Sequence, residues 1–299
     1  MRIAVYISLC LMLLSCKREL PYVQDKNIPN LPVVHAFICP DSSLFVNCRT
    51  LAGLLEEDKP ISQALFELSQ NRLFPLQSNY SGNGVHSFAG NSFKAGDSFF
   101  FSGQIGADKI IKVRGRIPNK VSITQADTLW QLIPGIGLAF SVDIQFTDSA
   151  AYANYYRVYF RKSSIRYTLD SADKITDSFS TVELIPIYSS SLPAVQNTFN
   201  NYTAKEVLFS DATFNGVKQK MSFYTTDKLK RSRTDIPTHI DLVVECIDKS
   251  LYTYYNTRNA HLWQQQSISQ IPGVVQGNIT GALGVVGAYT VERVLIQLK

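Results

Sequence analysis

The sequence predicts a mainly β protein: an immunoglobulin- or transthyretin-like β-sandwich, followed by a second antiparallel β domain with one helix near its end. Short β-branched and aromatic runs recur about every ten to twelve residues, separated by polar turns. Several runs alternate apolar and polar residues, as strands do when one sheet face covers a core and the other faces water. One stretch, residues 249–266, breaks this pattern and has helical spacing.

Residues 1–15 have the form of a lipoprotein signal peptide. Arg2 supplies a positive start, and residues 3–14 are apolar. This segment is shorter than the roughly 20 residues of a bilayer-spanning helix and has the proportions of a signal-peptide core. It ends in "LLSC", which resembles the bacterial lipobox and implies cleavage before Cys16 and lipidation of that cysteine, palmitate included. The alternative is an ordinary signal peptide with a chance cysteine at its end.

The residues after Cys16 favour the outer membrane. Position 17 is Lys, so the Asp of the enterobacterial inner-membrane retention signal is missing. Residues 16–30 are polar, contain two prolines and are expected to tether the anchor to the first strand. Both alternatives, the periplasmic face and the cell-surface face of the outer membrane, are compatible with the sequence.

The charge of the chain is modest. Its net charge is +5, and one small basic cluster occurs, at residues 228–233. Such a cluster is either a solvated loop or a contact for phosphate or acidic lipid headgroups. An exported location makes nucleic acid an improbable partner.

The first predicted unit covers residues 31–120. Three hairpins are expected in it, at residues 33–50 around "PDSS", at 64–77 turning at Gln70-Asn71, and at 97–118 around Gly106. Cys39 and Cys48 do not face each other in the first hairpin. With Cys246 they make an odd number, so we expect buried free thiols.

The second predicted unit covers residues 121–299. Residues 139–148 alternate strictly, and residues 154–162 place Tyr156 on an apolar face and Arg157 on a wet one. Residues 205–226 are expected to form a hairpin that turns at Asn215-Gly216.

Three aspartates of the second unit are predicted to stabilise turns or a helix end. Asp148 and Asp211 open turns after strands, where a carboxylate usually bonds nearby backbone amides. Asp248 is placed to cap the helix, whose Tyr252 and Trp263 fit either core packing or a contact surface.

The closing glycines raise the question of a phosphate-binding loop. Their spacing, G-x-x-x-G-x-x-G-x-x-G, matches neither a dinucleotide loop nor a P-loop, and a β-branched run follows. We expect Gly281, Gly284 and Gly287 to face protein, and residues 291–298 to lie in a sheet.

The sequence motifs that mark nucleophilic or metal-dependent catalytic sites are missing from the chain. No G-x-S-x-G occurs, no Cys/His spacing fits a metal, and the four histidines stand singly. The sequence therefore predicts no catalytic, cofactor-binding or metal-ligating residue.

Several stretches together resemble one family. They are "LLSC", "LPVVHAFICPDSSLFVNCRT", "KAGDSFFFSGQIGADKIIKVRGRIPNKVSI", "VDIQFTDSAAYANYYRVYF", "VLFSDATFNG", "DKSLYTYYNTRNAHLWQQ" and "NITGALGVVGAYTVERV". In this order they are similar to the Bacteroidota lipoprotein family known as domain of unknown function 4249 (DUF4249). The resemblance implies no catalytic residues. It implies a TonB-dependent outer-membrane receptor as partner, because members are often encoded beside one.

Two functions fit these observations. The first is a non-enzymatic lipoprotein that partners a TonB-dependent receptor in nutrient capture or uptake. The second is a surface adhesin that binds glycans or host proteins through aromatic side chains, for which Trp130, Trp263 and Tyr252 are the candidate contacts.

Overall fold

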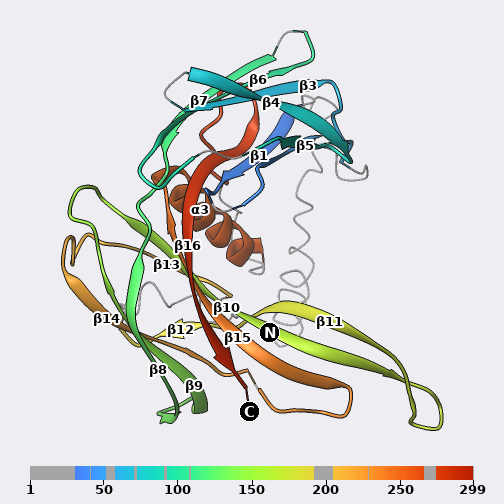
Figure 1. Ribbon diagram of the computed structural model, residues 1–299, viewed down its shortest axis with the longest axis vertical. Coiled ribbons are helices and arrows are strands. Elements are labelled where there is room, and N and C mark those ends of the chain that lie inside the picture. Colours follow the sequence, from blue (N-terminus) through green and yellow to red (C-terminus); the bar gives the residue numbers. More distant parts are fainter. Residues whose placement is uncertain are drawn as a thin grey trace, which may run out of the picture.

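The computed structural model shows two β units that share one long strand, with a helix packed at their junction (Figure 1). The mainly β fold that the sequence predicts is confirmed. Hydrogen bonds connect the strands into a twelve-stranded sheet and a four-stranded sheet. The structure describes residues 31–40, 42–51, 58–70, 73–90, 93–107, 109–191, 205–227, 229–265 and 274–298.

The first unit is a β-sandwich. One layer contains β1 (Pro32–Ile38), β2 (Phe45–Thr50) and β5 (Val85–Phe88), and the other contains β3 (Ala64–Gln70), β6 (Ser98–Ile105) and β7 (Lys109–Arg116). β4 (Leu73–Gly82) pairs with β3 and β5 and so joins the layers. The three hairpins predicted here are confirmed as antiparallel pairs. Apolar side chains from both layers form one core, with Val34, Phe66 and Phe101 fully or almost fully buried.

The second unit also has two layers around a core. In one layer β10 (Tyr155–Leu169) pairs with β11 (Ile175–Ile185), β13 (Val207–Ser210) and β15 (Asp235–Ile247). The other layer has the order β12 (Tyr188–Ser189), β14 (Lys218–Thr225), β9 (Gly137–Thr147), β8 (Ser122–Ile133). Val158 and Phe160 of the first layer meet Val142 and Phe146 of the second in a continuous core.

Helix α3 (Lys249–Gln265) matches the predicted helix over the residues that the structure describes. Asp248 caps it as predicted, because its carboxylate accepts a hydrogen bond from the amide of Leu251 at 2.8 Å. Leu251 and Tyr255 pack against Ile247 and Val285, so the helix covers the middle of the twelve-stranded sheet.

The last strand, β16 (Leu283–Gln297), belongs to both units. Its first part runs parallel to β1, from Val33 opposite Leu283 to Ile38 opposite Ala288. Its second part runs antiparallel to β15, from Tyr289 opposite Ile247 onward. The strand lies along the length of the molecule in Figure 1 and links the two units. The predicted division at residue 120 stays a prediction, and backbone hydrogen bonds cross it through this strand.

The closing glycines lie in two kinds of surroundings. A Cβ on Gly284 would lie 2.1 Å from the carbonyl oxygen of Val34, and one on Gly287 would lie 2.4 Å from Leu251 Cγ, so both face protein as predicted. The prediction for Gly281 is wrong: it occupies a turn with φ +83° and nothing lies within 4 Å of an added Cβ. Residues 291–297 lie in the sheet as expected, although the strand begins earlier, at Leu283.

The predicted hairpin over residues 205–226 is wrong. β13 pairs with β10 in one layer, whereas β14 pairs with β9 in the facing layer. The turn at Gly216, with φ +75°, therefore carries the chain across the core instead of closing a local pair. Strand β8 is not among the predicted strands, because nearly all of its side chains are exposed and its sequence shows no apolar–polar alternation. Cys39, Cys48 and Cys246 are buried thiols outside any disulfide, as predicted.

Replacing Gly284 tests how much stability the shared strand contributes. We expect Gly284→Ala to lower the free energy of unfolding by about 3 kcal/mol, because the methyl group meets the Val34 backbone at a strained positive φ. Gly281→Ala is the matched control, since it has the same strain in open space and is expected to cost about 1 kcal/mol. Urea denaturation of both variants measures the difference, and equal losses would contradict the close approach of β16 to β1.

Candidate functional site

The three aromatic residues predicted as contacts do not form one site. Trp130 lies on β8, half exposed, with its ring 5.3 Å from that of Phe140. Tyr252 and Trp263 lie on α3, and both are partly buried. The Tyr252 ring packs 4.8 Å from that of Tyr155, and burial raises its pKa. Tyr252 is therefore a packing residue of the helix, and the lipidation candidate Cys16 lies outside the described residues.

A cluster of paired charges lies beneath α3. Arg157 of β10 bonds Glu206 at 2.6 Å and Glu245 at 3.0 Å, and its guanidinium lies 4.5 Å from the ring centre of Tyr255. Arg258 of the helix also bonds Glu206, at 2.5 Å. The cluster ties the helix to the sheet through four charged side chains, two of each sign.

The ionisation of this cluster follows from its pairing. Burial alone would lower the pKa of Arg157, but the attraction of Glu245 and Glu206 raises it well above the usual value. Burial alone would raise the pKa of Glu206, but Arg157 and Arg258 lower it. Arg157 and Glu206 therefore stay charged at neutral pH. The prediction that Arg157 lies on a wet face is wrong, because α3 covers it and leaves its side chain only 15% exposed.

A second buried polar cluster joins the two layers of the second unit. Asp148 accepts hydrogen bonds from the Tyr156 hydroxyl, from the Asn154 side-chain amide at 2.9 Å and from the backbone amide of Gly216 at 2.9 Å. Asp211 accepts one from the backbone amide of Asn154 at 2.8 Å. Burial raises the pKa of Asp211, and the neighbouring Asp148 raises it further. The prediction that the two carboxylates bond nearby backbone amides is wrong, because the backbone amides that they accept from, those of Gly216 and Asn154, are distant in the sequence.

These carboxylates do not belong to a metal-binding cluster. Among the residues that the structure describes, no group of three or more His, Cys, Asp or Glu side chains is placed to hold a metal ion. The histidines make separate contacts: His35 Nε2 lies 3.1 Å from the Tyr254 hydroxyl, and His86 Nε2 lies 3.0 Å from the carbonyl oxygen of Ile61. Within the same part of the chain, no helix is long and apolar enough to cross a membrane.

An open pocket of about 500 Å³ lies where the two units meet. The guanidinium of Arg116 lies 3.6 Å from the ring centre of Tyr152, and its Nε donates to the carbonyl oxygen of Gly96 at 3.0 Å. Lys249 and Tyr155 line the same pocket. The pocket therefore combines aromatic and cationic groups with the carboxylate of Asp248.

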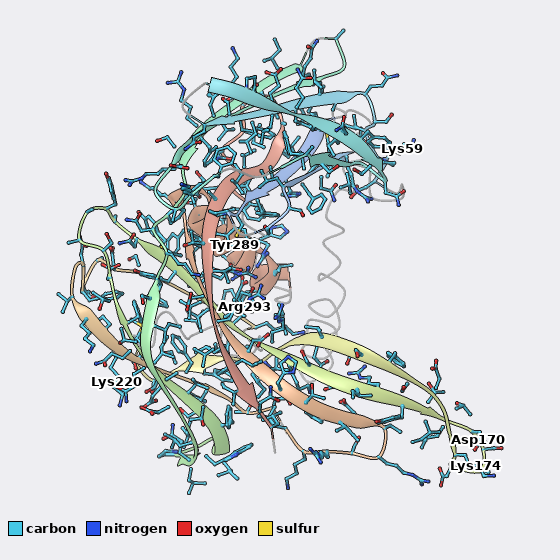
Figure 2. All side chains as sticks on the ribbon, viewed as in Figure 1. Lys59, Asp170, Lys174, Lys220, Tyr289 and Arg293 are labelled. Carbon is cyan, nitrogen blue, oxygen red and sulfur yellow. The ribbon has the colours of Figure 1, made fainter. Side chains whose placement is uncertain are left out.

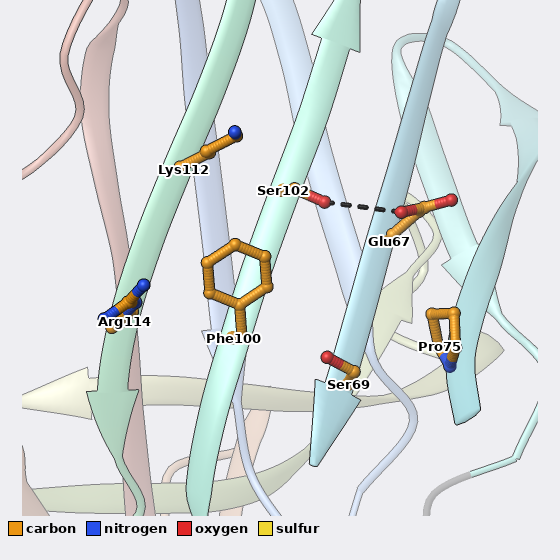
Figure 3. A pocket seen from close by; sticks show the side chains of 7 residues that line it. All are labelled: Glu67, Ser69, Pro75, Phe100, Ser102, Lys112 and Arg114. Atoms are coloured by element: carbon orange, nitrogen blue, oxygen red, sulfur yellow. Dashed lines mark hydrogen bonds between the residues drawn. The ribbon is translucent and has the colours of Figure 1, made fainter. Parts of the chain in front are cut away.

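A second hollow, of about 670 Å³, lies on the outer face of the first unit (Figure 3). β3, β6 and β7 present it, and Phe100 stands at its centre with the Arg114 guanidinium 5.7 Å from its ring. Ser102 donates a hydrogen bond to Glu67 at 3.5 Å. The hollow is shallow and polar, and its residues come from alternate positions of strands, which is why sequence motifs do not mark it.

Removing Arg157 tests the charge cluster. Arg157→Met leaves Glu245 and part of Glu206 buried without their partner, so we expect the free energy of unfolding to fall by about 3–5 kcal/mol. Arg233→Met is the control, because its ion pair with Asp173 is exposed and is expected to contribute less than about 0.5 kcal/mol. Denaturant titration measures both variants. A small loss in Arg157→Met would show that the helix does not depend on the cluster.

The helix cap predicts a pH dependence. Burial raises the pKa of Asp248 from 3.8 to about 6, so the folded protein binds its proton more tightly than the unfolded chain does. The contribution of this group to stability is fully present below about pH 4 and is lost as the pH rises to about 6. We expect the stability of the wild type relative to Asp248→Asn to fall by about 2 kcal/mol across this range. Urea denaturation at several pH values checks this, and an unchanging difference would contradict it.

Comparison with known proteins gives a family and little else. The model of the family described as Domain of unknown function (DUF4249) matches residues 18–294. No curated protein matches the chain. A crystal structure of a DUF4785 family protein from Legionella pneumophila subsp. pneumophila str. Philadelphia 1 is similar at 9% identity and a TM-score of 0.21. That match covers 71% of this chain and about half (51%) of the other, and at this TM-score it supports no inference. The chain belongs to the DUF4249 family.

Proposed function

We propose that this protein is a non-enzymatic outer-membrane lipoprotein that serves as an accessory partner of a TonB-dependent receptor in nutrient capture or uptake. The observation that carries the proposal is "LLSC", which ends at Cys16 directly after a short apolar segment. Acyl chains on that cysteine would hold the β units at a membrane. The family resemblance supports the choice of partner, because members are often encoded beside such receptors.

The use of buried charges supports a binding role over catalysis. Arg157 and Glu206 sit in ion pairs beneath α3, and Asp148 and Asp211 bond amides of neighbouring loops. Each of these groups is engaged by the fold itself, as is typical of a cluster that positions elements. The pocket at the junction and the hollow around Phe100 remain open to a ligand or a partner surface.

Affinity purification tests the proposal. We expect the tagged protein, produced at its native level and extracted in detergent, to co-purify with a TonB-dependent receptor. Cys16→Ser should lose metabolic labelling with palmitate and leave the outer-membrane fraction, because no acyl chain can attach.

Cys10→Ser is the matched control, since it removes the other cysteine of the signal segment and should change neither property. Recovery of no receptor with the wild-type protein would reject the partner. Palmitate labelling that survives in Cys16→Ser would reject the anchor.

The alternative is a surface adhesin that binds glycans or host proteins, and the exposed ring of Trp130 favours it. Aromatic faces on a protein surface stack against sugar rings, which present patches of C–H groups. Binding of the protein to a glycan array, lost in Trp130→Ala and kept in Trp263→Ala, would support this function in place of the first.

A further inference from the structure

The hairpin of β8 and β9 ends in an exposed apolar tip. Trp130 and Leu132 are 51% and 78% exposed, and Ile136 and Leu138 are 46% and 64% exposed. Leu132 lies opposite Leu138 in the strand ladder, and Trp130 lies opposite Phe140. The side chains of these two opposed pairs therefore lie on one face of the hairpin. Phe140 belongs to the core of the second unit. The apolar face of the hairpin therefore continues from this core to the exposed tip.

This tip carries no charge. Residues 128–142 contain no Asp, Glu, Lys, Arg or His, and the first charged side chains on either side are Asp127 and Asp143, which lie opposite each other in the ladder. Exposed protein surfaces normally intersperse charges with apolar side chains, and a contiguous apolar end marks a contact site. A hydrocarbon environment requires the absence of charge that this stretch shows.

A basic loop accompanies the apolar tip. Lys230, Arg231 and Arg233 are exposed in the connection from β14 to β15, and buried Leu229 holds this loop to the core. Arg233 pairs with Asp173 at 2.8 Å. In the part of the chain that the structure describes, Lys230 and Arg231 form no ion pair, so their charges are available to an anionic surface.

The tip and the loop lie at the same end of the molecule. The longest axis is vertical in Figure 1, and the β8–β9 turn, the β14–β15 loop and the end of β16 all reach its lower end. Figure 2 places Asp170 and Lys174, at the turn between β10 and β11, at that end as well, and Lys59 in the other unit. One flat surface can therefore meet the apolar tip and the basic loop together.

We propose that this end of the protein docks on an anionic lipid bilayer, with the β8–β9 tip in the interfacial layer and the basic loop on the headgroups. A tryptophan at the base of the tip fits the headgroup level, where its apolar ring and its N–H are both accommodated. Lys230 and Arg231 supply attraction to anionic lipids. A protein partner would not require an uncharged stretch, whereas a bilayer does.

The hydrogen bonding of the hairpin limits how deep it enters. β8 is an edge strand, and unpaired backbone groups are costly in hydrocarbon. At the tip, the backbone amide of Ile136 donates to the carbonyl oxygen of Ile133 at 3.0 Å, which closes the turn. Insertion by about 5–10 Å, the depth of interfacial segments, would bury the tip and leave most of the β8 edge in water.

Trp130 reports directly on this contact. The full chain with Cys16→Ser and Trp263→Phe has no lipidated cysteine and Trp130 as its sole tryptophan. With vesicles of phosphatidylcholine and phosphatidylglycerol in equal parts, we expect the Trp130 emission to shift to the blue. Brominated acyl chains in those vesicles should quench it. The readout is specific to the tip, whatever other segment touches the vesicle, so its failure is distinguishable from failure of the Cys16 anchor.

Matched variants in this background test both parts. Leu132→Asp with Leu138→Asp should abolish the quenching, whereas Leu65→Asp with Ile110→Asp, exposed on the first unit, should retain it. Lys230→Ser with Arg231→Ser should weaken the lipid dependence of quenching by about tenfold or more.

The control, Lys112→Ser with Arg114→Ser, removes the same two positive charges from the first unit. It should change the lipid dependence of Trp130 quenching little. The proposal is overturned if Trp130 is neither shifted nor quenched at saturating lipid. It is also overturned if both charge variants weaken quenching equally. Circular dichroism establishes that each variant is folded.

Discussion

The arrangement of both β units depends on the hydrogen bonds of β16. Its first residues pair with β1 and its later residues pair with β15, so a single backbone fixes the first unit relative to the second. The close approach at Gly284 makes the parallel pairing possible, because any side chain there would meet the Val34 carbonyl. The position of α3 follows from the same strand, since the Asp248 carboxylate also accepts the amide of Ala288 in β16 at 2.7 Å.

Polar groups buried in this fold link its elements to one another. The ion pairs of Arg157 attach α3 to the sheet, and the hydrogen bonds of Asp148 attach two loops to β10. Both clusters lie in places where apolar packing alone would leave the register of neighbouring elements undetermined. At the surface, the β8–β9 tip is exposed, and the junction pocket and the hollow around Phe100 are open to solvent.

Local patterns in the sequence predict the elements well and their long-range pairing poorly. The hairpins of the first unit and the helix at 249–265 were predictable, because turn residues and spacing act within a short stretch. The predicted hairpin at residues 205–226 was wrong because β14 pairs with the distant strand β9. Arg157 was predicted to be exposed, but helix α3, which is distant in the sequence, covers it. Of the candidate contacts, Trp130 is half exposed, whereas Tyr252 packs in the helix interface.

The parallel pairing of β1 with β16 also sets the order in which the chain can fold. Val33 and its partner Leu283 stand far apart in the sequence, so the first sheet stays one strand short until β16 is present. Closing so long a loop costs entropy that only the completed contacts repay. Until β16 has been synthesised and has paired with it, β1 has an unpaired edge exposed to aggregation.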